Sequence, residues 1–140
     1  MVVKTCISFH FFFVKTETKV TLLNNASGEF SSPGYPNTTS GFFAWHIRVN
    51  EHHRIFLQFL DFQLHPHRLC RRDYVILYDG SSIDAPLIGR WCWKAFSEMI
   101  NNTYNSSSKS FYLVFRGHPS FSRKGFNVTY FSCKYIPNIS

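Results

Sequence analysis

Short apolar segments alternate with polar turns along most of this chain, and many apolar positions recur at every second residue. A period of two predicts β-strands, because successive side chains of an extended chain point to opposite faces. The clearest case is 43–49, where Phe43, Trp45 and Ile47 share one predicted face. Further strands are predicted at 54–62, 74–78, 88–91, 111–115 and 126–131.

The segment 54–62 is apolar on both of its predicted faces. Ile55, Leu57 and Phe59 lie on one face, and Phe56 and Leu60 lie on the other. A strand that is apolar on both sides usually has both faces covered. We therefore expect this strand to run through the inside of a sandwich.

Turn-forming residues separate the predicted strands. Pro and Gly cluster at 31–36, and the pair Asp79-Gly80 follows the strand at 74–78. The polar segment 97–110 predicts an exposed loop. Many short strands separated by turns predict an all-β fold, an antiparallel β-sandwich or jelly roll, in one domain. The 16 Phe residues agree with this, because aromatic side chains favour strands.

The formal net charge is +7 with His neutral, and this favours acidic partners such as acidic proteins or sulfated glycans. A merely soluble basic surface explains the same charge. Nucleic acid is not an expected partner, because the chain has no Lys/Arg-rich run interleaved with aromatic residues. The sequence also lacks the hydrolase, zinc-protease and nucleotide-binding motifs, so we expect a protein that is not an enzyme.

Asparagine usage indicates the compartment. Six of the nine Asn residues begin an Asn-x-Ser/Thr sequon, whereas chance gives about one or two at this Ser and Thr content. The excess predicts an N-glycosylated extracellular protein, either secreted or the ectodomain of a membrane protein. The candidate glycosylation sites are Asn25, Asn37, Asn101, Asn105, Asn127 and Asn138.

Residues 1–19 resemble a leader more than a part of the domain. Lys4 precedes an apolar run at 6–14, as in a signal peptide, but His10 interrupts the run and no clear cleavage site follows. A degraded signal peptide and a wrongly chosen start codon both explain this pattern. The run is too short to cross a bilayer, so no membrane span is predicted in this chain.

Seven motifs, in their order and spacing, resemble the CUB domain family. The resemblance covers about 110 residues, and it implies a jelly-roll β-sandwich of the CUB type at 20–131 with a tail at 132–140. The family occurs in secreted and cell-surface proteins, where it mediates protein contacts. The motifs are GEFSSPGYP at 28–36, WHI at 45–47, FLDFQL at 59–64, CRRDYVILYDG at 70–80, LIGRWC at 87–92, FYLVF at 111–115 and GFNVTY at 125–130.

The resemblance implies one disulfide bond, between Cys70 and Cys92, which match the second disulfide of the family. The first disulfide of the family is missing. Ala44 stands where one of its cysteines belongs, and Thr18 and Lys19 stand where the other belongs.

The pairing of the two further cysteines, Cys6 and Cys133, has more than one solution. Cys6 is lost if the leader is removed, and Cys133 is then free or bound to another chain or module. A bond between Cys6 and Cys133 requires that the leader is retained.

Many CUB domains bind calcium through carboxylates at one end of the sandwich. The corresponding positions here hold His65, Asp73 and His118, so one carboxylate of three is kept. Imidazole is a poor ligand for Ca²⁺, which takes oxygen ligands, and we expect no calcium and no other cofactor. One alternative is a zinc site made by the same three residues. The simpler alternative is that the two histidines are exposed loop residues that bind no metal.

Arg68, Arg71, Arg72 and Arg116 are expected near the same end as His118. A cluster of this kind inverts the charge that calcium-binding relatives carry there. We therefore expect the ligand to be an acidic protein or a sulfated glycan, with pH sensitivity from the histidines.

The expected function is that of an extracellular, non-catalytic protein-binding or adhesion module. Two alternatives remain: an accessory CUB module of a larger secreted protease or receptor, and a free-standing secreted protein that resembles the spermadhesins and binds acidic glycans. Trp91 and Trp93 are candidate aromatic contact anchors, whereas Trp45 is expected in the core.

Overall fold

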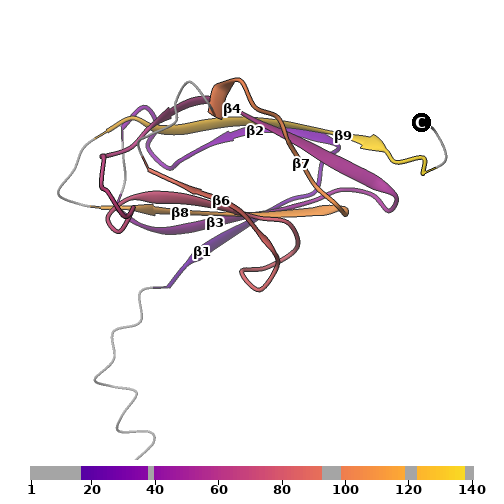
Figure 1. Cartoon of the computed structure of the whole chain (residues 1–140), viewed down its shortest axis with the longest axis horizontal. Helices are drawn as coiled ribbons and strands as arrows, with labels where there is room; N and C mark the ends of the chain where they lie inside the picture. Colours follow the sequence, from indigo (N-terminus) through magenta and orange to yellow (C-terminus); the bar gives the residue numbers. More distant parts are fainter. Residues whose placement is uncertain (1–16, 38–39, 93–98, 119–122, 138–140) are drawn as a thin grey trace, which may run out of the picture.

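The computed structural model describes residues 17–37, 40–92, 99–118 and 123–137. They form two β-sheets packed face to face, one above the other in Figure 1. The five-stranded sheet has the order β1 (Lys19–Leu23), β3 (Gly41–Arg48), β8 (Ser110–Gly117), β5 (Tyr74–Tyr78) and β6 (Leu87–Trp91). The four-stranded sheet has the order β2 (Ser27–Ser31), β9 (Gly125–Lys134), β4 (His53–Gln63) and β7 (Tyr104–Asn105). The all-β sandwich predicted from the sequence is confirmed.

The two-residue period identifies the inner faces of the sheets correctly. Ile55, Leu57 and Phe59 of β4 are completely buried. Trp45 and Ile47 of β3 are buried on the inner face of the opposite sheet, so Trp45 is a core residue as expected.

Phe126 of β9 lies where the two sheets meet. Its ring packs against Phe30 and Phe59 of its own sheet, with centroids 6.3 and 6.2 Å away. The same ring also contacts Trp45 and Phe115 of the other sheet, both at 5.4 Å. Such edge-to-face contacts across the interface make Phe126 the aromatic centre of the core.

The prediction that β4 is covered on both faces is wrong. Phe56 is only half-buried, and Leu60 is 45% exposed, because both point away from the five-stranded sheet. β4 is a central strand of its sheet, but within the described residues no third layer covers its outer side. Its apolar outer residues therefore meet solvent.

The exposed loop predicted at 97–110 is wrong in part. Met99 is buried, β7 pairs with β4, and Tyr104 packs its ring against Phe59. Ser106 is also buried, and its Oγ accepts a hydrogen bond of 2.7 Å from the backbone N–H of Ile55. Scattered single apolar residues among sequons gave no periodic signal for this segment.

The first strand was not predicted. β1 pairs with β3 in parallel, and Val20 stands opposite Ala44. This ladder lies close to the position where the family resemblance implies the missing first disulfide. Hydrogen bonds of the backbone therefore join the two segments here.

Candidate functional site

Asp73 immediately precedes β5 and is completely buried. Its Oδ2 accepts a hydrogen bond of 3.1 Å from the backbone N–H of His65, which ties together the two ends of the loop between β4 and β5. Its Oδ1 is buried and has no hydrogen-bond partner among the described residues. A buried carboxylate oxygen without a hydrogen-bond partner is costly, so Asp73 lowers the free energy of unfolding of the domain.

His65 and Asp73 are neighbours through this hydrogen bond, and His118 follows β8. Within the described ranges, no group of three or more His, Cys, Asp or Glu side chains is placed to hold a metal ion. The donor set also fits calcium poorly, because two of the three family positions offer imidazole nitrogen in place of carboxylate oxygen. Of the three carboxylates that the resemblance implies for many relatives, this chain therefore keeps one, on Asp73.

A disulfide joins Cys70, in the loop before β5, to Cys92, directly after β6, with Cα atoms 5.4 Å apart. His67 shapes the same loop, because its Nδ1 accepts backbone hydrogen bonds from Leu69 and Arg71 at 3.2 and 3.3 Å. The loop between β4 and β5 is thus fixed to the edge of the five-stranded sheet.

Two arginines hold this loop through its carbonyl groups. Arg90 donates to the carbonyl of Cys70 at 2.6 Å, and Arg116 donates to the carbonyl of Arg71 at 3.1 Å. Their guanidinium groups also lie over the rings of Tyr74 and Phe42, 4.1 and 5.2 Å from the ring centroids. Within the part of the chain that the structure describes, neither Arg90 nor Arg116 forms an ion pair with a carboxylate.

Asp61, near the end of β4, places a further carboxylate at this end of the sandwich. Its Oδ2 accepts a hydrogen bond from the hydroxyl of Tyr35 and lies 4.0 Å from Nζ of Lys124. The hydrogen bond to Asp61, with burial and the negative charge adding to it, raises the pKa of Tyr35 above its usual value. Asp61 is therefore held by Tyr35 and Lys124, whereas Asp73 is buried.

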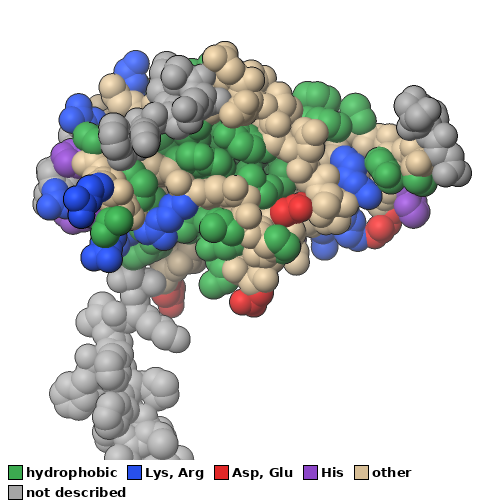
Figure 2. Space-filling view, in the orientation of Figure 1, with side chains coloured by type: hydrophobic (Ala, Val, Ile, Leu, Met, Phe, Trp, Pro, Cys, Tyr) green, Lys and Arg blue, Asp and Glu red, His purple; other side chains and the backbone are tan. Residues whose placement is uncertain are grey.

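The end of the sandwich that carries the β4–β5 loop is called the basic end. Figure 2 shows Lys, Arg and His side chains gathered at the left end of the molecule, whereas the right end mixes both signs of charge. The exposed loop arginines stand beside the two arginines that bind the carbonyl groups of the loop, so positive charge gathers at this end. The surface is defined by Arg68, Arg71, Arg72, Arg90 and Arg116.

The expectation that Trp91 is an aromatic contact anchor is wrong. Its ring is partly buried and packs against Phe59 and Tyr104, with centroids 5.8 and 5.2 Å away. Trp91 is therefore a packing residue at the sandwich edge and not an exposed contact anchor. Trp93 lies outside the described residues.

The candidate glycosylation sites differ in their surroundings. Asn127 is half-buried, and its Nδ2 donates a hydrogen bond of 2.8 Å to Glu29. Asn138, like Cys6, lies outside the described residues. The remaining sites are exposed: Asn25, Asn37, Asn101 and Asn105.

A two-sheet β-sandwich with a disulfide between the β4–β5 loop and the end of β6 defines the class of this chain. The family model of the CUB domain matches residues 18–130. The chain belongs to the CUB domain family.

Individual relatives agree with this assignment. The human CUB and zona pellucida-like domain-containing protein 1 is 30% identical over 98% of this chain and 22% of its own length. The zinc metalloproteinase nas-39 of Caenorhabditis elegans is 36% identical over 79% of this chain and 12% of its own length. The structure of the MASP-1 CUB2 domain bound to Ca²⁺ has a TM-score of 0.64 and 27% identity, over 79% of this chain and 96% of that one.

The chain spans less than a quarter of the length of these two curated relatives, in which the CUB domain is one module of a larger protein. CUB relatives are extracellular proteins or the ectodomains of membrane proteins, and the extracellular assignment from the sequons agrees with them. Among the described residues, no helix has the length and apolar character needed to cross a membrane.

Proposed function

We propose that this CUB domain is a non-catalytic binding module that takes an acidic ligand at its basic end. The observation that carries the proposal is the placement of Arg90 and Arg116, which bind backbone carbonyls of the β4–β5 loop and form no ion pair with a described carboxylate. Hydrogen bonds to carbonyls fix the two side chains but leave their charge in place. A fixed positive surface attracts acidic groups with little ordering cost.

An acidic surface of an extracellular protein is the ligand that this arrangement fits best, and a sulfated glycan carries the same charge. The rigid loop supports the proposal, because the disulfide and the His67 hydrogen bonds hold Arg71 close to Arg116. CUB domains are generally non-catalytic modules, and the proposed binding role requires no catalytic group.

Removal of two exposed loop arginines tests the basic end. We expect the variant Arg68→Ser/Arg71→Ser to elute from a heparin column at a lower salt concentration and to bind heparin about fivefold more weakly, because exposed charge contacts contribute modestly each. The control is Arg48→Ser/Lys134→Ser, which removes the same charge from two exposed positions. Arg48 ends β3 and Lys134 ends β9, so both lie at the end of the sandwich away from the basic end. Equal elution of the two variants contradicts the proposal, because net charge alone then explains the binding.

The ligand is further proposed to bind without calcium. We expect about 5 mM Ca²⁺ to leave the melting temperature of the protein unchanged, because His65 and His118 replace two carboxylates of the family site. In the variant His65→Glu/His118→Asp, the same calcium concentration should add about 1 kcal/mol to the free energy of unfolding, as for a site of millimolar affinity. Thermal melting with calcium and with EDTA is the measurement. A clear stabilisation of the unmodified protein by calcium argues against this part of the proposal.

A place within a larger secreted protease or receptor is compatible with the same role. The short coverage of the curated relatives supports this arrangement. In that setting the basic end serves as the accessory binding surface for the larger protein.

A further inference from the structure

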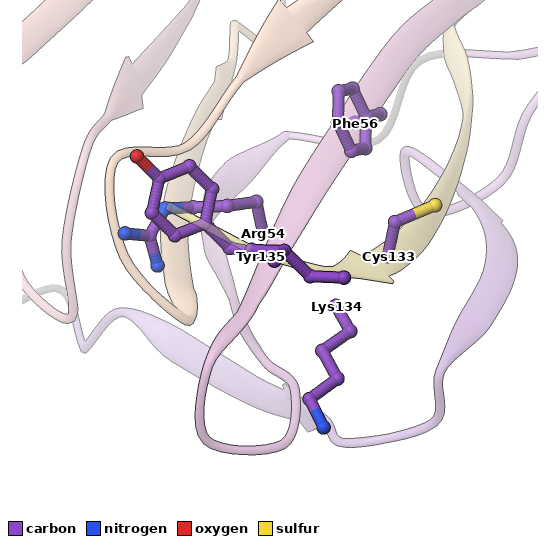
Figure 3. Close-up of a pocket in the computed structure, with 6 residues that line it drawn as sticks. Arg54, Phe56, Cys133, Lys134 and Tyr135 are labelled. Carbon is purple, nitrogen blue, oxygen red and sulfur yellow. The ribbon is translucent and has the colours of Figure 1, made fainter. Parts of the chain in front are cut away.

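The outer face of the four-stranded sheet carries an aromatic pair. Phe56 of β4 and Phe131 of β9 are cross-strand partners, and their rings stack 5.0 Å apart with an angle of 12° between their planes. Phe131 is 49% exposed. Figure 3 shows Phe56 beside Cys133 and Arg54 on this face, around a shallow, mostly apolar pocket. Two stacked phenyl rings at a solvent-facing surface are a costly exposure unless something covers them.

Asn105 is the next residue in the same row. β7 pairs with β4 so that Asn105 stands directly opposite Phe56, and Tyr104 stands opposite Leu57. Directly opposed residues of antiparallel strands point to the same face, with Cβ atoms about 4.5–5.5 Å apart. Tyr104 packs into the core against Phe59, so its neighbour Asn105 points outward beside Phe56. The row on the outer face therefore runs Asn105, Phe56, Phe131.

Asn105 also begins a sequon, Asn105-Ser106-Ser107, and it is exposed. The extracellular character of the family places the chain where such sequons are glycosylated. We propose that Asn105 carries an N-glycan whose first N-acetylglucosamine lies on the ring of Phe56 and covers the Phe56–Phe131 pair. The sugar offers C–H groups on one face of its ring, and these pack against the face of an aromatic ring, while its hydroxyl groups remain in water.

The surroundings separate this sequon from two others. Asn37 follows the turn at residues 34–36, and its backbone N–H bonds to the carbonyl of Gly34. Asn127 lies on the same outer face as Asn105, but its side chain donates to Glu29. Asn105 is thus the described sequon asparagine whose cross-strand partner is a partly exposed aromatic residue.

The test uses the protein secreted from a cell line that makes only high-mannose glycans. Endoglycosidase H leaves the first N-acetylglucosamine on each asparagine, and peptide N-glycosidase F removes the whole glycan. We expect the melting temperature to stay the same after the first enzyme and to fall by about 3–5 °C after the second. Mass spectrometry of the glycopeptide should show Asn105 occupied. An unoccupied Asn105, or an equal loss of stability with both enzymes, overturns the proposal.

Substitutions test whether the glycan is attached at Asn105 and whether its first sugar packs on Phe56 and Phe131. Ser107→Ala removes the sequon and keeps Asn105, so we expect it to melt about 3–5 °C lower than the glycosylated protein, whereas Asn37→Gln should not. In a double-mutant cycle, Phe56→Ser should remove most of the difference between the Ser107→Ala and Ser107 proteins, although it lowers both melting temperatures. Phe131→Ser provides the second cycle if Phe56→Ser does not fold. A full effect of Ser107→Ala in both Phe backgrounds contradicts the packing of the sugar on this pair.

Discussion

Replacement of Phe126 by alanine is expected to lower the free energy of unfolding by about 3–5 kcal/mol, the largest effect of a single substitution that we predict for this domain. Phe126 is completely buried, and its ring contacts aromatic residues of both sheets: Phe30, Phe59, Trp45 and Phe115. Alanine leaves a cavity lined by large rings on two rigid sheets, and rings held by neighbouring strands relax little into such a space. Urea unfolding followed by tryptophan fluorescence measures the change.

Phe131→Ala is the matched control on the same strand. Its side chain is 49% exposed and contacts Phe56 on the outer face, so we expect a loss below about 1.5 kcal/mol. Both variants are compared without N-glycans, after expression in a bacterial periplasm, where the disulfide forms. If the two substitutions cost the same, Phe126 is not the centre of the core that the structure shows.

Loss of the disulfide is expected to have the next largest effect. The double variant Cys70→Ser/Cys92→Ser should lose about 3 kcal/mol, because the bond closes a loop across a sequence separation of 22 residues and restricts the unfolded chain. The same variant frees the loop that carries Arg71, so we also expect it to bind heparin more weakly. Equilibrium unfolding in urea gives the first number, and heparin elution gives the second.

Cys133→Ser provides the control for cysteine removal. Cys133 is an exposed free cysteine at the end of β9, and we expect its replacement to change the free energy of unfolding by less than about 0.5 kcal/mol. A destabilisation by Cys133→Ser as large as that of the double variant contradicts the assignment of the disulfide to Cys70 and Cys92.

Much of the sandwich was predictable from local patterns. Strands with one buried face, such as β3, show a two-residue period that solvent exposure imposes on the sequence, and this period located Trp45 and Ile47 correctly. β1, β2 and β7 escaped prediction for a physical reason. Val20 and Leu22 of β1 are more than half exposed, Phe30 is the one large apolar residue of β2, and β7 has only two residues. None of these strands therefore carries a complete buried face.

The candidate site was predictable as a set of residues but not as a surface. The family resemblance drew attention to His65, Asp73 and His118, and the arginines between residues 68 and 116 suggested a reversal of charge. The sequence could not show that Asp73 is completely buried, because a charged residue next to a strand is usually exposed. It also suggested Trp91 as a contact residue, although the fold places that ring against Phe59.

The amino-acid sequence by itself determined the class of the fold and the extracellular character, and its resemblance to the CUB family implied which two cysteines are bonded. Periodicity, sequons and motif spacing are local properties, and they survive without knowledge of which strands are neighbours. The tertiary structure alone decided which side of β4 faces water, that Arg90 and Arg116 bind carbonyl groups of the β4–β5 loop, and that Asn105 stands beside Phe56. Each of these depends on the pairing of segments far apart in the chain, because cross-strand neighbours are chosen by sheet order and register and not by sequence distance.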